Sequence, residues 1–119
     1  MKEAKEWMRK AEKDLRTAKV NLDNKEYEAA AFFSHQAAEK ALKALYIVKF
    51  GRLWKTHDLV GLLAELRGAV ELMGICEELN PHYIETRYPT DARYTKPVSV
   101  GAIKNAEKVI AWTKKMVLG

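Results

Sequence analysis

The sequence predicts an all-α fold, an antiparallel up-and-down bundle of four long helices with a short or kinked fifth element. Apolar residues recur at steps of three and four through most of the chain, and no segment shows the strict alternation of a strand. The 119 residues are 48% hydrophobic and 31% charged, which suits one globular core. Predicted connections are short, so successive helices pack side by side. We therefore expect a single helical domain over residues 1–119.

The first two helices are predicted from their apolar faces. The first ends near Asn24 and carries one apolar stripe at helical spacing, formed by Trp7, Ala11, Leu15, Ala18 and Leu22. The second runs from about Glu26 to Lys49, and Gly51 is its stop signal. It carries seven alanines between Tyr27 and Val48, which let neighbouring backbones approach closely. We expect this second helix at the centre of the bundle.

The third helix is expected to begin between Thr56 and Asp58, with an apolar stripe of Leu59, Leu63, Leu66, Val70 and Met73. The fourth is expected from Leu72 or Ile75 to Arg87, and Pro81 marks either a kink or its first turn.

Pro89 ends the fourth helix, because a proline disfavours the α conformation of the residue before it, here Tyr88. After a loop, the last helix is predicted to begin near Ser99 as its N-cap.

Composition excludes several function classes. The net charge is +5, but 16 acidic residues are mixed among 21 basic ones, unlike the segregated charge of a dedicated DNA binder. No stretch approaches the ~18 apolar residues of a membrane span, and residues 1–6 lack the apolar core of a signal peptide. We expect a cytoplasmic protein that does not act at a membrane. The single cysteine, Cys76, lies in an apolar run and is expected to be a buried, inert thiol.

The sequence indicates neither a cofactor nor a metal. Its glycines are scattered singly, so there is no glycine-rich phosphate loop of the P-loop or Rossmann kind. The three histidines, His35, His57 and His82, lie on three different predicted elements without metal-ligand spacing.

A polar strip on the second helix is the first candidate site. Its members, Gln36, Glu39, Lys40 and Lys43, are spaced three and four apart and face one side of that helix. They form either a binding face or a solvated surface with ordinary ion pairs.

The second candidate site surrounds the proline-terminated helix end. It combines two guanidinium groups with phenol rings and a carboxylate: Tyr83, Arg87, Tyr88, Asp91, Arg93 and Tyr94. Arginine suits phosphate and tyrosine rings suit a nucleobase, so a nucleotide or an unstacked RNA base is the expected ligand. Alternatively, Arg87 bonds Asp91 and fixes the loop. His57 either joins this site or only supports the start of the third helix.

The residues from Phe32 to Leu45, then Thr56-His57-Asp58-Leu59, then Tyr83 to Pro89, resemble the HEPN family in order and spacing over nearly the whole chain. The resemblance implies a small helical bundle that forms a homodimer around a shared cleft lined by the arginine-bearing helix end. Many stand-alone members resemble partners of a separately encoded minimal nucleotidyltransferase in toxin-antitoxin-like gene pairs. Others are metal-independent ribonucleases, whose signature is an arginine followed a few residues later by a histidine.

Only half of that ribonuclease signature is present here. Arg87 matches the arginine and is the only catalytic candidate, whereas Ala92, Arg93 and Tyr94 occupy the positions where the histidine would fall. Neither an aspartate nor an arginine replaces a histidine readily as a neutral-pH acid or base. We therefore predict a non-catalytic or weakly catalytic binding module, which binds a nucleotide or RNA or docks a nucleotidyltransferase.

Two alternatives stay open. In the first, the protein is a ribonuclease that uses Arg87 with Tyr94, Asp91 or a histidine from another element. In the second, it is a structural adaptor whose cleft is filled by its dimer mate. An apolar surplus that would form such an interface comprises Phe32, Tyr46, Ile47, Phe50, Leu53 and Trp54.

Overall fold

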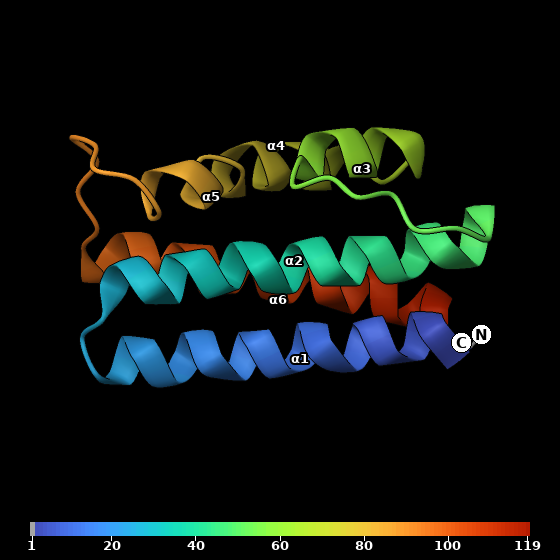
Figure 1. The fold of residues 1–119 in the computed structure, drawn as a ribbon, viewed down its shortest axis with the longest axis horizontal. Helices are drawn as coiled ribbons and strands as arrows, with labels where there is room; N and C mark the ends of the chain where they lie inside the picture. The colour runs from blue at the N-terminus through green and yellow to red at the C-terminus, as the bar shows by residue number, and fades with distance from the viewer. Residues whose placement is uncertain (1) are drawn as a thin grey trace.

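The computed structural model describes residues 2–119, and these fold into six helices with no strand among them (Figure 1). Three are long: α1 (Lys2–Asp23), α2 (Tyr27–Phe50) and α6 (Lys96–Leu118). Three are short: α3 (Leu59–Glu65), α4 (Val70–Leu79) and α5 (His82–Glu85). The all-α bundle predicted from the sequence is confirmed.

Helix α2 is the centre of the bundle, as predicted. It contacts each of the other five helices, with α1 on one side and the layer of α3, α4 and α5 on the other (Figure 1). Six of its alanines are fully buried: Ala30, Ala31, Ala37, Ala38, Ala41 and Ala44. Small side chains at these positions allow helices to pack on every side of α2, so few of its residues reach solvent.

The end of α2 is also as predicted. Gly51 adopts a left-handed conformation with φ 71°, and its N–H donates to the carbonyl of Ile47 at 2.8 Å. Glycine takes this conformation without the Cβ penalty of other residues. The chain then turns back along α2, so that α3 begins near the middle of that helix (Figure 1).

The third predicted helix is interrupted. Arg67 has a φ of 51°, and Gly68 donates its N–H to the carbonyl of Leu63 at 3.0 Å. A Cβ at Gly68 would collide with the side chain of Leu63, so a larger residue at this turn would force Leu63 to move. Helix α3 therefore ends at Glu65, and α4 begins at Val70, earlier than predicted.

The break at Pro81 is confirmed, since it separates α4 from α5. The predicted N-cap of the last helix is wrong. Thr95 caps α6 by accepting a hydrogen bond from the Val98 N–H, and Pro97 lies in the first turn, where its missing N–H is tolerated. Ser99 is buried instead, and its hydroxyl donates to the carbonyl of Tyr27 at 2.7 Å.

Two further properties bear on function. Cys76 is fully buried, as predicted, and burial raises the pKa of its thiol to about 12. No helix within residues 2–119 is both long enough and apolar enough to cross a membrane.

Candidate functional site between α2 and α5

A buried carboxylate on α2 lies at the base of the candidate site. Glu39 is 3% exposed, and its Oε2 accepts a hydrogen bond from Lys43 Nζ, one turn further along the helix, at 2.9 Å. Its other oxygen, Oε1, lies 2.8 Å from His57 Nδ1. A buried charge requires such partners, because desolvation without them is unfavourable by several kcal/mol. Glu39 thus joins a buried ion pair to a histidine at the surface.

The backbone around His57 is fixed by a second histidine. His35 is fully buried on α2, and its Nε2 donates to the His57 carbonyl at 3.0 Å. Burial lowers the pKa of His35, which favours its neutral form. The connection between α2 and α3 is therefore attached to α2 through both the backbone and the side chain of His57.

Asn80, at the end of α4, holds the other side of this connection. Its Oδ1 accepts the Leu59 N–H at 2.8 Å, and its Nδ2 donates to Asp58 Oδ1 at 2.8 Å. This hydrogen bond lowers the pKa of Asp58. The first turn of α3, the end of α4 and α2 thus fix the position of His57 together.

The ring of Tyr83 on α5 connects His57 to Arg87. The imidazole stacks on this ring, with centroids 4.0 Å apart and planes 16° apart. The Arg87 guanidinium lies 4.5 Å from the same ring centroid and 5.5 Å from that of Tyr88. We call His57, Tyr83, Arg87 and Tyr88 the Arg87 cluster. The side chain of His57 is 50% exposed, and Arg87 and Tyr88 are exposed too.

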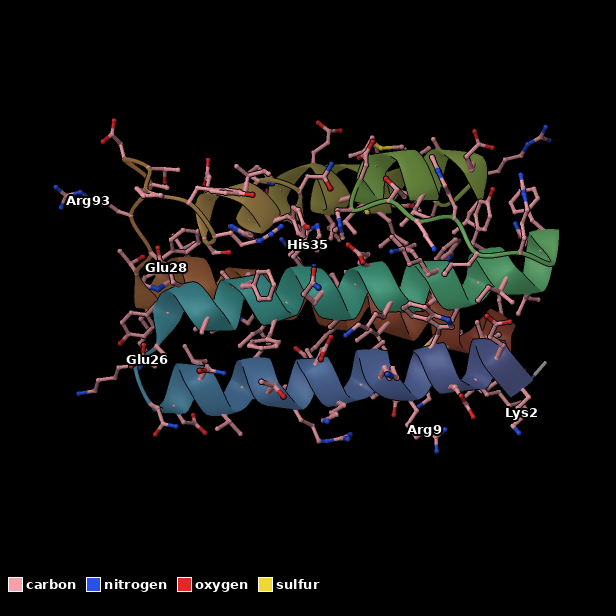
Figure 2. The ribbon with its side chains drawn as sticks, in the orientation of Figure 1. Lys2, Arg9, Glu26, Glu28, His35 and Arg93 are labelled. Atoms are coloured by element: carbon pink, nitrogen blue, oxygen red, sulfur yellow. The ribbon has the colours of Figure 1, made fainter. Side chains whose placement is uncertain are left out.

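A shallow hollow of about 350 Å³ lies beside Arg87, between the start of α2 and the end of α5. Phe32 and Phe33 give it aromatic walls, and their rings meet edge to face at 5.4 Å. Glu26 and Glu28 also line it, at the end of the bundle where Arg93 lies (Figure 2). Among the described residues that line this hollow, Arg87 is the only cation.

The four residues of the predicted polar strip do not share one surface. Lys40 forms an ion pair with Asp14 of α1, whereas Lys43 is 5% exposed and pairs with Glu39. Gln36 contacts the His35 ring at 3.1 Å. Only Glu39 reaches the Arg87 cluster directly. The four side chains contact different neighbours because other helices cover α2 on several sides. The periodicity of α2 alone does not reveal which sides are covered.

Asp91 and Arg93 lie on the exposed loop between α5 and α6. The alternative interpretation, in which Arg87 bonds Asp91, is not supported, because that pair is not among the ion pairs of residues 2–119. Arg93 points away from the helices (Figure 2). The structure therefore brings Tyr83, Arg87 and Tyr88 together with His57, but not with Asp91 or Arg93.

Sequence reasoning missed the two interactions that organise this region. The bond between Glu39 and His57 joins residues 18 apart with no shared periodicity. The second is a pair at 2.9 Å between His82 Nδ1 and the Tyr94 hydroxyl, which also donates to Glu85 at 3.4 Å. Burial lowers the pKa of His82 and raises that of Tyr94. His82 and Tyr94 thus attach the loop to α5.

Within residues 2–119, no three His, Cys, Asp or Glu side chains gather as metal ligands would. The fold and the cluster together define a small helical-bundle protein with an exposed arginine supported by aromatic rings. The chain belongs to the HEPN domain family, whose model matches residues 4–116.

Relatives agree with this assignment. A Methanocaldococcus jannaschii protein named "Putative toxin MJ1304" is 28% identical, with 92% of this chain and 85% of that protein aligned. The crystal structure of TT1696 from Thermus thermophilus matches with a TM-score of 0.90 and 31% identity, covering 97% of this chain and 98% of that one. ST0689, described as an archaeal HEPN homologue, matches with a TM-score of 0.82 and 27% identity, covering 96% and 97%.

Proposed function

We propose that this protein is a HEPN module of a toxin-antitoxin-like pair, and that the Arg87 cluster binds a nucleotide or an RNA chain in the cytoplasm. One observation carries the proposal: Tyr83 supports both an imidazole and a guanidinium at an exposed surface. The archaeal relative named as a toxin supports the toxin-like role.

The chemistry of the cluster suits such a ligand. A guanidinium binds phosphate oxygens through two parallel hydrogen bonds, and its packing against aromatic rings limits its conformations. The exposed ring of Tyr88 offers a surface for base stacking, as do Phe32 and Phe33 in the hollow. In this proposal the phosphate lies at Arg87 and an unstacked base lies against an aromatic ring.

This proposal is tested by measuring the affinity of the wild-type protein and of Arg87→Gln for a fluorescent single-stranded RNA and for ATP. We expect Arg87→Gln to weaken binding about tenfold or more, the scale of a lost charge-assisted contact. The matched control is Arg52→Gln, because Arg52 also stacks on a tyrosine, Tyr46, but follows α2 at the opposite end of that helix. Equal affinities for the two variants contradict the proposal.

The proposal includes two protein partners. One is a second copy of this chain, whose Arg87 cluster would line a shared cleft with that of the first, and the other is a separately encoded minimal nucleotidyltransferase. Exposed apolar side chains near Arg87, Ile84 at 52% and Tyr88 at 53%, are suited to such a contact. Light scattering at micromolar concentration and copurification with the product of the neighbouring reading frame test the two partners separately. A clean monomer contradicts the homodimer.

A second candidate function, metal-independent RNA cleavage, is favoured by the bond between Glu39 and His57. When Nδ1–H donates to the carboxylate, a neutral imidazole presents Nε2 as a base, the arrangement by which carboxylates orient catalytic histidines. In this mechanism His57 removes the proton of a ribose 2′-hydroxyl, and the 2′-oxygen attacks the adjacent phosphorus to form a 2′,3′-cyclic phosphate. The P–O5′ bond breaks, the 5′-oxygen leaves with a proton from water, and Arg87 stabilises the charge on the attacked phosphate. His57 would then take the place of the histidine that is missing after Arg87.

Incubation of labelled RNA in EDTA tests this candidate. His57→Gln and Arg87→Ala are each expected to reduce cleavage by about 100-fold or more, as removal of a general base or charge stabiliser does. Glu39→Gln should reduce it less, because Glu39 positions the imidazole. If the wild-type protein leaves the RNA intact, the ribonuclease hypothesis is contradicted and the binding module is the function that remains.

A further inference from the structure

The surface of α1 that faces away from the bundle carries a straight row of cations. Its members lie at steps of three, four, four and three residues and are all exposed: Lys2, Lys5, Arg9, Lys13 and Arg16. We call them the outer row. The buried apolar residues of α1, Ala4, Met8, Ala11 and Ala18, lie on the opposite side of the helix. Charges that are mixed along the sequence are therefore segregated in space.

Few acidic side chains neutralise this row. Asp14 forms its ion pair with Lys40 of α2, and Glu12 with Lys114 of α6 at 2.8 Å. Both acids therefore lie toward the flanks of α1 that pack on its neighbours. Within the described part of α1, Glu6 is the one acid paired with the row, at 3.7 Å from Arg9, and both of these side chains are more than half exposed. An exposed pair of this kind contributes little and is screened by salt.

The shape of the row restricts its ligand. Five cations over fifteen residues of a rigid helix span about 21 Å, which requires an equally extended anion. Two shallow hollows follow the row, one along Lys2, Lys5 and Arg9 and the other from Arg9 to Arg16. Glu6 lines both hollows as their one acidic residue among those that the structure describes. A nucleic-acid duplex supplies an anion of this length and density, since even double-stranded DNA carries about one phosphate per 1.7 Å of axis.

Two other ligands suit the row less well. A helix that lies on a membrane inserts an apolar face, but the apolar face of α1 is covered by the bundle, and Val20 is the one exposed large apolar residue between positions 2 and 23. Sites for unpaired strands combine cations with aromatic rings on which bases stack, and the outer row contains no aromatic residue. The ligand that suits the row best is therefore one that is contacted through its phosphates alone.

We propose that the outer row of α1 binds the phosphate backbone of base-paired RNA without reading its sequence. This inference rests on the proposed function for the choice of RNA, but it concerns a separate surface. Lys2 and Arg9 point away from α2, whereas His35 lies between α2 and α5, on the other side of the bundle (Figure 2). An RNA stem on the outer row would leave the Arg87 cluster free for an unpaired segment.

The test is anisotropy with a fluorescent RNA duplex of about 20 base pairs at several salt concentrations. The variant is the triple substitution Lys5→Gln, Arg9→Gln, Lys13→Gln. The matched control removes three exposed lysines of α6, through Lys104→Gln, Lys108→Gln, Lys115→Gln. Both triples change the net charge equally and place glutamine, a good helix former, on exposed positions.

We expect the outer-row triple to weaken duplex binding about tenfold or more at moderate salt. It should also flatten the plot of log K against log salt by about 2 to 3, since each phosphate contact contributes roughly 0.9 to the slope. The control triple should leave the slope within about 0.5 of wild type, because it removes no phosphate contact.

Three results overturn the inference: equal losses in both triples, no loss in either, or tighter binding to a DNA duplex of the same length. Anionic phosphatidylserine vesicles form a further arm, and an outer-row triple that loses vesicle binding but keeps the duplex also overturns it. Single-stranded RNA binding by Arg87→Gln separates the two surfaces. If Arg87→Gln loses single-stranded RNA binding but keeps duplex binding, both proposals are supported. If Arg87→Gln binds single-stranded RNA as the wild type does, the proposed function of the Arg87 cluster fails, while the proposal for the outer row is unaffected.

Discussion

Two ion pairs lie close together on α2 and have different surroundings. Lys40 pairs with Asp14 of α1 and connects two helices. Lys43 pairs with Glu39 on the same helix, and Glu39 also holds His57, whose side chain is 50% exposed. The first pair ends at the interface of two helices, whereas the second continues through a histidine to the surface. The comparison teaches that buried charge on α2 has two roles, helix packing and support of a surface cluster.

The largest expected effect comes from breaking the more buried pair. Lys43→Met leaves Glu39 without its cation in a site that is 3% exposed, so we expect a loss of about 3 kcal/mol in the free energy of unfolding. Urea denaturation measures this loss. The double variant Lys43→Met, Glu39→Met should recover part of the stability, since no uncompensated charge remains. A single variant that keeps wild-type stability contradicts the importance of this pair.

The pair between α1 and α2 should contribute less. The side chains of Lys40 and Asp14 are 24% and 12% exposed, so water compensates part of a lost partner. We expect Lys40→Met to reduce the free energy of unfolding by about 1 to 2 kcal/mol. RNA binding should be unchanged, because Lys40 does not contact the Arg87 cluster. A loss of binding larger than that of Lys43→Met would reverse the roles assigned to the two pairs.

The histidines His35 and His82 should make the stability of the fold depend on pH. Burial lowers the pKa of His35 and of His82, while in the unfolded chain both titrate near 6.5. The unfolded state therefore binds more protons below that pH, so stability is complete above pH about 6.5 and falls as the pH decreases toward the lowered values. We expect His35→Gln and His82→Gln each to flatten this decline in urea titrations between pH values of about 7.5 and 5.5. An unchanged slope in both variants contradicts the assignment.

The smallest effect is expected at the exposed end of the cluster. Arg87→Gln and Arg52→Gln each remove an exposed stacking interaction with a tyrosine, and such contacts contribute about 0.5 to 1 kcal/mol. We expect similar, small decreases in thermal stability for both. A large loss in Arg87→Gln alone would mean that Arg87 supports the fold, and binding data for that variant would then need the stability correction.

Much of the fold could be predicted because it depends on local rules. The alanines of α2, the stop at Gly51 and the break at Pro81 each follow from a residue's own conformational preferences. The interruption at Gly68 could not be predicted, since it depends on the space left by Leu63 and Trp112. Ser99 is of a residue type that caps helices, but Thr95 precedes Pro97 at the spacing that a cap requires.

The candidate site was predicted less completely. Arg87, Tyr83 and Tyr88 are neighbours in the sequence, so their proximity follows from one short segment. The contribution of Glu39 and His57 depends on three elements packing together, and periodicity along one helix carries no such information. The residues of the polar strip are separated for the same reason. The helices that cover α2 determine which of its side chains remain accessible.

The buried thiol of Cys76 has a practical consequence. Cys76 is the only cysteine in the sequence, and it lies on α4, packed in the core with no exposed surface. Its raised pKa keeps it protonated, and only the thiolate reacts. The rate at which a thiol reagent labels the native protein therefore reports how often α4 separates from the core, without any engineered probe. Comparing that rate with and without RNA would test whether RNA binding, if it occurs, keeps α4 packed on the core.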